Sequence, residues 1–443
     1  MSAVPETGTT PETNTFRRVG VRATRRATVI AFFAWLFAVF DYIMFGTLLP
    51  QIASSFGWSE ATASLVSTLV SVGTAIIALA VGPVVDRIGR RKGMILTVSG
   101  TAVASALSAA TPGAGYLIGV RSLGGLGLSE QAVNATYLNE IYAVTDDEVI
   151  KKRRGLVYSL VQGGWPLGVL LASAWVAIFL PSIGWRGCFL LAVFPAVLIA
   201  LMRRGLRESP QFELELQLRA LRKEGKTAEA TELARSYGVD DQPSAPLTAI
   251  FRGQALRNTV VLGFAWFINW FGIQVFSVLG TTVLTEGKHV SFTNSLLLLI
   301  VINAVGYLGY VAHGFLGDRL GRRNVIAFGW ILSGVLFALM LTVATSTLSV
   351  VVLYSLGMFF LVGPYAALLF YMGECYDTRC RATGTGFLNA LSQPGAILAG
   401  VIVTSMLASG VDWGHAALVV GAVGTFVSGF VMFGARKAAV LQG

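Results

Sequence analysis

The sequence contains little charge. Only 13% of its 443 residues are Asp, Glu, Lys or Arg, whereas 54% are hydrophobic. This balance excludes an ordinary soluble globular protein and predicts a chain that crosses the membrane several times. The formal net charge is +10, but we expect the basic residues at the cytoplasmic surface, with Arg121, Arg186 and Lys288 as the exceptions. The basic excess then reflects membrane topology, and we predict no nucleic-acid partner.

Chemically reactive side chains are scarce as well. The chain has three cysteines, which fall near the ends of different apolar runs and imply no disulfide framework. None of its three histidines has a second metal ligand or a nucleophile at a useful spacing. The G-x-x-x-x-G-K-[ST] loop of ATP-binding proteins is also missing from the sequence. We therefore predict no enzymatic activity, no metal and no cofactor, and we do not expect ATP as an energy source.

The hydrophobic residues are concentrated in twelve runs, each close to the roughly 20 residues that a membrane-spanning helix needs. They predict an all-α integral membrane protein whose helices form two sets of six. The spans are expected at 27–50, 62–84, 93–110, 113–134, 155–180, 185–202, 259–284, 292–316, 325–345, 348–372, 383–407 and 415–433. An even number of spans places both termini on one side, and basic residues at 17–26 and 436–437 predict that this side is the cytoplasm.

These spans divide the chain into five parts. We expect a cytoplasmic tail at 1–26, a six-helix bundle at 27–202, a cytoplasmic linker at 203–257, a second six-helix bundle at 258–435 and a cytoplasmic tail at 436–443. The linker is charged and polar, with helix-forming stretches at 213–223 and 227–235. A solvated connector is the favoured interpretation of this linker, and a partner-binding segment is the alternative.

One short motif occurs twice. The pattern Gly-x-x-x-Asp-Arg-x-Gly-Arg-Arg fills residues 82–91 and returns at 314–323, an offset of 232 residues (314 − 82). A fixed offset of about half the chain indicates that one architectural unit is duplicated. In each copy the glycines permit a tight turn between two spans, and the arginines stay at the cytoplasmic surface.

Two six-helix halves, a long middle loop and this duplicated turn resemble the major facilitator superfamily of secondary transporters. Residues 121–127 (RSLGGLG) resemble the Arg-plus-glycine pattern of that family's fourth helix. Residues 374–384 (ECYDTRCRATG) are similar to a segment of metabolite:proton symporters, notably those that carry organic anions. Residues 206–212 (LRESPQF) are similar to a stretch of sugar-porter-like members, and 163–168 partly match a glycine-proline pattern of drug/proton antiporters.

The resemblance implies two pseudo-symmetric bundles that give alternating access to a central site, with the proton gradient as the energy source. It favours proton-coupled uptake of a small organic acid, including aromatic or sugar acids. Sugar or polyol symport and drug/proton antiport stay open, and a non-transporting sensor that signals through the linker is a remote alternative. The expected partners are a small-molecule substrate, protons and the bilayer of the cell inner membrane, and we expect a monomer.

Few ionisable side chains fall inside the predicted spans, and the informative ones are Asp41, Arg121 and Glu130. Such groups cost about 2.5–3.5 kcal/mol in hydrocarbon, so each needs a partner or a function. At 1.5 Å per residue, Asp41 lies roughly 13 Å and Arg121 about 12 Å from the outer ends of their helices. They are therefore level and can pair, and an unpaired guanidinium also recognises carboxylates well.

We predict that Asp41 takes up a proton when the pair with Arg121 opens and releases it when the pair re-forms. The resemblance to proton-coupled members, in which a first-helix Asp and the fourth-helix Arg have these roles, implies the same. The alternative is a static ion pair that only joins two helices. Glu130 is either a second proton site or substrate contact, or a bundle-interior carboxyl hydrogen-bonded to Tyr or Asn.

Uncharged polar residues beside glycine or proline at mid-membrane depth are the candidates for substrate contact, because interrupted helices expose backbone where a cavity exists. Each of them could instead make only a helix–helix hydrogen bond. Asn269 and Asn303 both fall near mid-membrane, which favours that pair. With Arg121, the candidates are Asn134, Gln162, Trp165, Asn269, Gln274, Asn303, Tyr307, Tyr365, Asn389 and Gln393.

Charged residues at the cytoplasmic ends predict a gate. Glu140 and Glu374 occupy mirrored positions and are expected to face Arg153/Arg154 and Arg379/Arg381, so that ion pairs hold the inner side closed. A purely topological role for the arginines is the alternative. The predicted gate residues are Asp86, Arg87, Arg90, Glu140, Asp318, Arg319, Arg322, Glu374 and Arg379.

Overall fold

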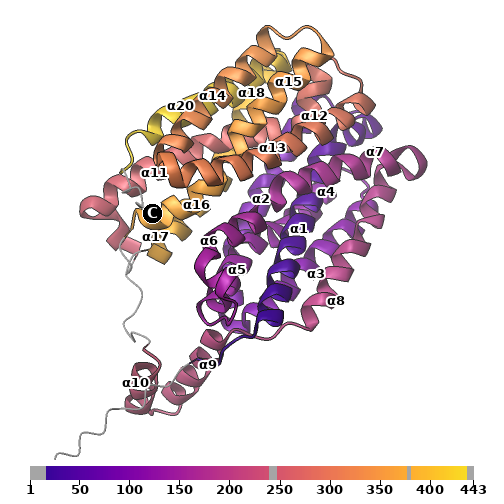
Figure 1. Ribbon diagram of the computed structural model, residues 1–443. Coiled ribbons are helices and arrows are strands. Elements are labelled where there is room, and N and C mark those ends of the chain that lie inside the picture. Colours follow the sequence, from indigo (N-terminus) through magenta and orange to yellow (C-terminus); the bar gives the residue numbers. More distant parts are fainter. Residues whose placement is uncertain (1–15, 239–246, 377–380, 437–443) are drawn as a thin grey trace, which may run out of the picture.

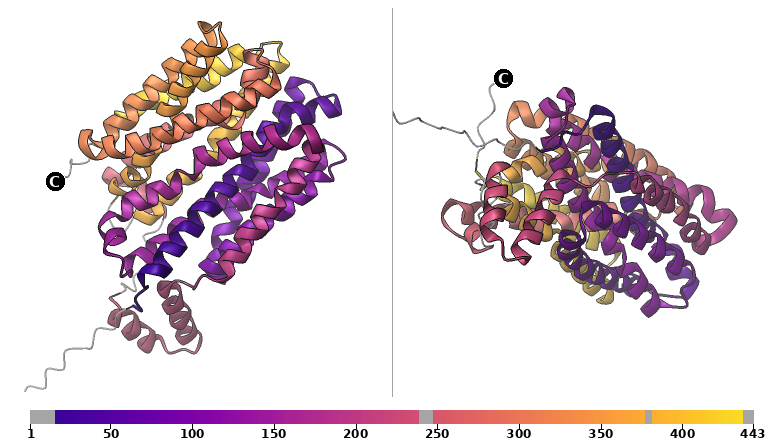
Figure 2. Two further views of the ribbon diagram at one scale, coloured as in Figure 1. Left: turned by 45° about the vertical axis from the view of Figure 1, so that its right-hand side comes forward. Right: turned by 90° about the horizontal axis from the view of Figure 1, so that it is seen from below.

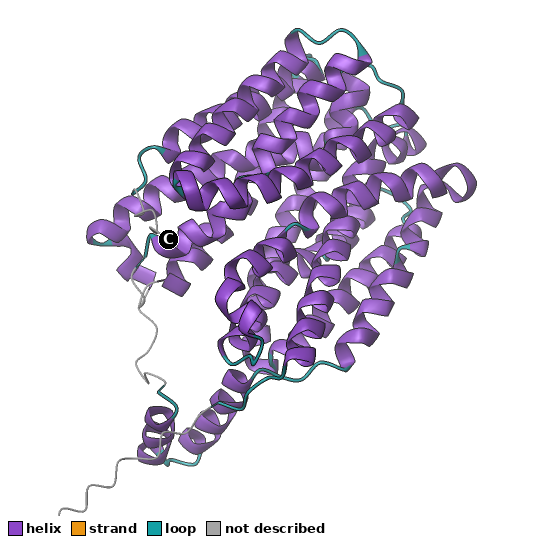
Figure 3. Cartoon of the chain, viewed as in Figure 1, coloured by secondary structure: helices purple, strands orange, loops and turns teal. Residues whose placement is uncertain are grey.

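The computed structural model describes residues 16–238, 247–376 and 381–436, and all regular secondary structure in these residues is helical (Figure 3). The helices form two groups that lie side by side, one from the first half of the chain and one from the second (Figure 1). The two groups remain separate from the other directions of view (Figure 2). This is the arrangement that two sets of six spans predict.

The first bundle holds the predicted spans one to six. Its helices are α1 (Val21–Phe56), α2 (Glu60–Ile88), α3 (Arg90–Ala109), α4 (Ala114–Ser122), α5 (Gly124–Ala143), α6 (Glu148–Gln162), α7 (Gly164–Leu191) and α8 (Val193–Arg204). The fourth span is α4 followed by α5, and the fifth is α6 followed by the first part of α7. Helix α7 contains a non-helical residue at Gly184, with φ 65°. Since that conformation suits only glycine, the chain reverses there and begins the sixth span, which α8 completes.

The second bundle repeats this organisation with more π-helical turns. It contains α11 (Gly253–Gly272), α12 (Gly280–Thr282), α13 (Phe292–Leu320), α14 (Arg322–Thr342), α15 (Thr347–Val362), α16 (Tyr365–Glu374), α17 (Arg381–Ala390), α18 (Ser392–Ala408), α19 (Trp413–Ala416) and α20 (Val423–Met432). The π-helical segments are η2 (Ile273–Val278), η3 (Val283–Gly287) and η4 (Ala417–Ala422), and a 3-10 turn η1 (Leu247–Phe251) precedes α11.

Within the described residues, nine helical stretches are long and apolar enough to cross a membrane. One of them, Val157–Arg204, has 48 residues and turns back at Gly184, so it accounts for two crossings. Helix α3 packs against α5 and α8 within the first bundle. Helices α4 and α5 both pack against α2. Together these elements make up the twelve predicted spans.

The segment between the bundles contains α9 (Pro210–Lys223) and α10 (Thr227–Ser236), which occupy the two stretches predicted to be helical. Leu214 and Leu218 of α9 pack against Ala230 and Ala234 of α10. The two helices project from one end of the molecule (Figure 1), which we call the linker end. We expected the first bundle to end at residue 202 and the linker to begin at residue 203. In the structure Arg203 still belongs to the first bundle, where its side chain is buried.

The duplicated motif forms the same turn in both bundles. Gly89 joins α2 to α3 with φ 101°, and Gly321 joins α13 to α14 with φ 88°. Glycine adopts these positive angles without the steric cost that a Cβ would bring, which explains why the motif has glycine there. An arginine begins the next helix in both cases, so the repeat seen in the sequence is also a structural repeat.

Candidate transport site

Asp41 of α1 and Arg121 of α4 form a buried ion pair. Arg121 Nη2 donates to Asp41 Oδ2 at 3.0 Å and to the Asp41 main-chain oxygen at 2.8 Å. Ser105 of α3 donates its hydroxyl to the other carboxylate oxygen of Asp41. Both charged residues are less than 5% exposed. Three helices of the first bundle therefore meet at one carboxylate, and the charge on Asp41 is compensated directly.

The guanidinium of Arg121 keeps unused hydrogen-bonding capacity. Its Nε and Nη1 are buried and have no hydrogen-bond partner among the residues that the structure describes. The ring faces of Phe45 and Phe189 lie 5.8 and 5.2 Å from its Cζ and contribute cation–π attraction. Unpartnered buried N–H groups are costly, and these two nitrogens could donate to a further anionic or polar group.

Aromatic side chains from both bundles gather between them, beside this ion pair. Tyr42 follows Asp41 on α1, and its ring centroid lies 6.5 Å from that of Trp165 in α7. The Trp165 ring lies 5.9 Å from that of Trp270 in α11, across the two halves. Trp266 continues the series toward Tyr365 of α16, with centroids 4.9 Å apart. We call these five residues the aromatic cluster.

Several buried polar atoms around the aromatic cluster lack hydrogen-bond partners in the described part of the chain. The indole Nε1 atoms of Trp266 and Trp270 and both amide atoms of Gln274 are unpartnered. Trp165 differs, since its Nε1 donates to Ser277 Oγ at 3.2 Å. Donors and a planar apolar wall are the features that small-molecule sites combine to orient a ligand.

The two mid-membrane asparagines have different surroundings. Asn269 accepts a hydrogen bond from the Tyr365 hydroxyl at 2.5 Å and donates to Ser428 Oγ at 3.2 Å, so it is held within the second bundle. Asn303 donates to the Leu299 carbonyl one turn earlier in α13, and its Oδ1 is unpartnered. The structure therefore joins Asn269 to Tyr365 of the predicted set.

Glu130 belongs to a second buried ion pair that the sequence analysis missed. Arg203 of α8 donates to both carboxylate oxygens of Glu130, at 2.8 Å for the bond from Nη1, and both side chains are fully buried. Thr97 donates to Glu130 at 2.5 Å, and Asn134 accepts from Arg203 at 3.0 Å. Asn134 also donates to the Ala31 carbonyl. The hydrogen bonds of Glu130 and Asn134 are thus made inside the first bundle, and neither residue belongs to the aromatic cluster.

The remaining candidates divide into interface residues and peripheral ones. Gln162 accepts from Gln131 at 2.9 Å and donates to the Tyr158 hydroxyl at 2.7 Å, which ties α6 to α5. Tyr307 of α13 packs so closely on Gly163 that an added Cβ there would lie 2.9 Å from its ring. Asn389 and Gln393 are half-buried on α17 and α18, and Gln393 Oε1 lacks a partner within the protein.

The gate residues pair within each half. Glu140 accepts from Arg90 Nη2 at 3.3 Å and from the Ser209 hydroxyl, and Glu374 pairs with Arg322 in the equivalent place of the second bundle. These partners differ from the Arg153/Arg154 and Arg379/Arg381 that we expected. The side chains of Asp86, Asp318, Arg153, Arg154 and Arg381, and all of Arg379, lie outside the described residues. Arg87 and Arg319 are exposed.

The structure thus combines two helical bundles, two buried ion pairs in the first of them and unpartnered donors between the bundles. Comparison with known proteins gives the class of the chain, because its family and its relatives are membrane transporters and not enzymes. Residues 31–313 match the family model described as the Major Facilitator Superfamily, and the chain belongs to this superfamily. The resemblance inferred from the duplicated turn is therefore confirmed, as is the fold of twelve helices in two bundles.

The chain is also similar to individual transporters. It is 25% identical to the niacin transporter NiaP of Acinetobacter baylyi, over 84% of this chain and 85% of that protein. It is 28% identical to a probable 4-methylmuconolactone transporter of Cupriavidus pinatubonensis, over 80% of this chain and 77% of that protein. A gallate transporter of Pseudomonas putida is 26% identical, with 86% and 85% of the two chains covered.

Proposed function

We propose that the protein takes up a small aromatic carboxylic acid by proton-coupled symport. The observation that carries this proposal is the buried pair of Asp41 and Arg121, in which Arg121 still has two unpartnered N–H-bearing nitrogens. Niacin and gallate, named for two relatives, are aromatic acids. The proposed setting is the cell inner membrane, with both termini in the cytoplasm and the protein acting as a monomer.

Coupling follows from competition for one guanidinium. An arriving carboxylate attracts Arg121 through its free Nε and Nη1, since paired N–H···O bonds to a carboxylate are among the strongest in proteins. As Arg121 turns toward the substrate, Asp41 loses its counter-charge and takes up a proton, because an uncompensated buried carboxylate is costly. When the substrate leaves, the pair re-forms and the proton is released on the other side.

The aromatic cluster gives the proposed substrate class. The rings of Trp165 and Trp270, and those of Trp266 and Tyr365, now pack edge to face, so a flat substrate ring would enter the cluster as these rings separate. The indole N–H groups of Trp266 and Trp270 would then be free to donate to hydroxyl or carboxyl oxygens on its rim. Tyr42 links this place to the ion pair, because it neighbours Asp41 and contacts Trp165. A movement of α1 on substrate binding would therefore reach both the cluster and the proton site.

Transport assays with purified protein in proteoliposomes test the proposal. We expect labelled gallate or nicotinate to accumulate inside the proteoliposomes when the outside is acidic. The accumulated acid should leak out after an uncoupler is added, and excess unlabelled acid should compete with the labelled acid for uptake. Arg121→Ala should abolish accumulation. Glucose accumulating as the sole substrate, or an acid accumulating equally without a proton gradient, would refute the proposed function.

A further inference from the structure

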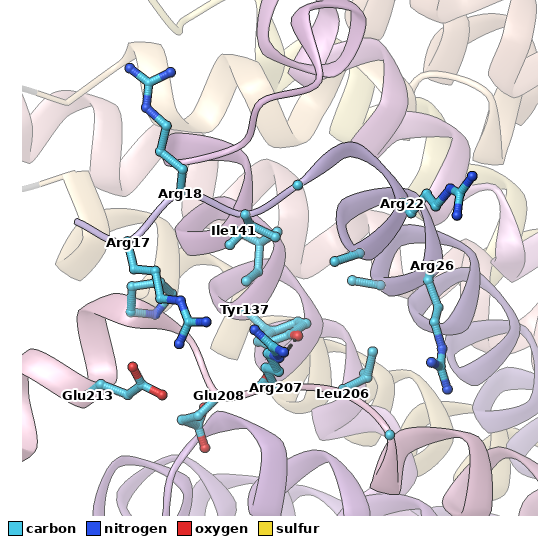
Figure 4. A pocket seen from close by; sticks show the side chains of 16 residues that line it. Arg17, Arg18, Arg22, Arg26, Tyr137, Ile141, Leu206, Arg207, Glu208 and Glu213 are labelled. Carbon is cyan, nitrogen blue, oxygen red and sulfur yellow. Dashed lines mark hydrogen bonds between the residues drawn. The ribbon is translucent and has the colours of Figure 1, made fainter. Parts of the chain in front are cut away.

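A cavity of about 510 Å³ opens at the linker end of the first bundle. Its walls are the start of α1, the inner end of α5 with Tyr137 and Ile141, and the segment from Gly205 into α9. Figure 4 shows its labelled side chains, with Arg17 and Glu213 on one side and Arg22 and Arg26 on the other. The transport site described above does not include any of these residues.

The lining of this cavity is strongly basic. Five arginines line it, Arg17, Arg18, Arg22, Arg26 and Arg207, against two carboxylates, Glu208 and Glu213. The lining therefore carries a net charge of +3. Glu208 already accepts from the main-chain N–H groups of Arg91 and Ser209, at 3.1 Å each for the shorter bonds.

Four of the five arginines have no ion pair with another described residue. Arg18 pairs with Asp146 at 3.5 Å, and the neighbouring Arg25, outside the cavity, donates to Asp147 at 2.7 Å and holds the pKa of that carboxyl below its ordinary value. Among the described residues, by contrast, Arg17, Arg22, Arg26 and Arg207 have no ion-pair partner. Four guanidinium groups around one cavity repel one another, and the carboxylates of Glu208 and Glu213 offset this repulsion only in part, so a bound anion would relieve it.

The backbone around the cavity is fixed by specific contacts. Val19 donates to the Val144 carbonyl at 3.0 Å and accepts from the Asp146 N–H at 2.9 Å, which anchors the segment that bears Arg17. The Tyr137 hydroxyl donates to the Arg207 carbonyl at 3.0 Å and holds the opposite wall. The arginines thus project from an ordered frame.

We propose that this cavity binds a phosphate-bearing anion. The planar guanidinium fork matches phosphate oxygens in geometry, and basic pockets beside membrane helices suit anionic lipid headgroups. Arg22 and Arg26 lie at the start of α1, next to the predicted first span, which is the level of lipid phosphates in the proposed topology. An acidic phospholipid is therefore the favoured source of the phosphate, and a soluble phosphate is the other. The inference is independent of the transported substrate.

Thermal unfolding of the purified full-length protein in detergent tests the site. The probes are dioctanoyl phosphatidylglycerol, dioctanoyl phosphatidylcholine, and sodium phosphate at matched ionic strength. We expect saturable stabilisation by phosphatidylglycerol and none by phosphatidylcholine. In Arg22→Gln/Arg26→Gln, the concentration for half-maximal stabilisation should rise about thirtyfold, because each basic residue near the membrane surface strengthens binding of an anionic lipid about fivefold.

Arg252→Gln/Arg257→Gln is the matched control, since it removes two exposed arginines at the start of α11 in the other bundle. This control should respond like the wild type. Arg207→Gln on the opposite wall serves as a second variant should the double variant not fold. Equal stabilisation by sodium phosphate alone would support the site and assign it to a soluble phosphate. Equal responses of all variants, or equal effects of the two lipids, would overturn the proposal.

Discussion

At the scale of single residues, the first bundle contains two buried ion pairs with different surroundings. In the Asp41–Arg121 pair the arginine retains unpartnered Nε and Nη1. In the Glu130–Arg203 pair every carboxylate oxygen is bonded, and Thr97, Asn134 and the Met94 carbonyl complete the network. Among the described residues, only Nε of Arg203 lacks a hydrogen-bond partner in the Glu130–Arg203 pair, against Nε and Nη1 of Arg121 in the other pair. The more fully bonded network stabilises one packing arrangement, whereas the less fully bonded one leaves room for exchange. This difference supports the proposal that Asp41 couples transport to protons, and it favours a structural role for Glu130.

The sequence allowed one of these pairs to be predicted. Asp41 and Arg121 lie at equal depth in helices of known direction, so their contact follows from helix geometry. Arg203 follows an apolar run directly, where basic residues normally mark the membrane surface. Only the packing of α8 against α3 and α1 places Arg203 inside the bundle, and hydropathy carries no information on that packing.

Glu130→Gln should destabilise the protein, because it leaves Arg203 as an uncompensated buried charge. Breaking such a pair costs about 3–5 kcal/mol, which a fall in the midpoint of thermal unfolding would report. The control is Glu215→Gln, whose partner Arg219 lies on the exposed surface of α9 at i,i+4; its cost should be about 0.5 kcal/mol or less. A Glu130→Gln variant of normal stability that no longer couples transport to protons would contradict the structural role.

Trp266→Phe should weaken substrate binding about fivefold while leaving the fold intact. The substitution keeps an aromatic ring against Tyr365 but removes the unpartnered indole N–H, and one hydrogen bond contributes about 1 kcal/mol. The measurement is the affinity for a transported aromatic acid by thermal shift. Trp330→Phe is the comparison, because its Nε1 already donates to the Leu361 carbonyl; it should lower stability rather than affinity. Unchanged affinity in Trp266→Phe would remove Trp266 from the site.

At the scale of elements, the duplicated turn and the breaks inside the spans show which parts of the fold could be predicted from the sequence. The turn was predictable, since two copies of one motif between apolar runs require the same bend. The breaks between α4 and α5 and between α15 and α16 were harder to predict from the sequence. Gly124 and Gly363-Pro364 permit an interruption, but the hydropathy of both spans is continuous, so only backbone hydrogen bonding locates the break.

Gly89→Ala should destabilise the first bundle by about 1–3 kcal/mol. Residue 89 has φ 101°, and an added Cβ would lie 2.5 Å from Glu208 Oε2 and 2.8 Å from the Phe212 ring. The strain would reach the start of α9 as well as the turn itself. Gly386→Ala, in α17 with open space around it, should be neutral or slightly stabilising. Equal unfolding midpoints of the two variants would show that the turn tolerates a side chain.

At the scale of the whole molecule, the two bundles are packed together at the end opposite the linker helices. Ser64 of α2 and Thr404 of α18 share a hydrogen bond of 2.8 Å there. A Cβ on Gly400 would lie 2.3 Å from Thr68 Oγ1, so the two helices touch through a glycine. Under the proposed topology this is the outer side, and its closure must be reversed for a substrate to enter.

Gly400→Leu should hold the outer side open. Overpacking of this contact by about 1.4 kcal/mol would shift the balance between closed and open states about tenfold. The readout is labelling of Ser64→Cys by a membrane-impermeant maleimide added outside, in a background that lacks the three native cysteines. Gly119→Leu, where nothing lies within 4 Å, should label like the parent. Unchanged labelling in Gly400→Leu would contradict the assignment of this contact as a gate.

The most direct test of the account is substrate-induced proton uptake by Asp41→Asn in proteoliposomes, measured beside exchange of labelled acid for unlabelled acid. Asp412→Asn, which changes an exposed carboxylate at the start of α19, is the control and should behave like the wild type. We predict that Asp41→Asn still exchanges labelled for unlabelled substrate. It should show no substrate-induced proton uptake and should not accumulate the substrate. Accumulation by Asp41→Asn with undiminished proton uptake would contradict the central claim that this carboxylate couples the two fluxes.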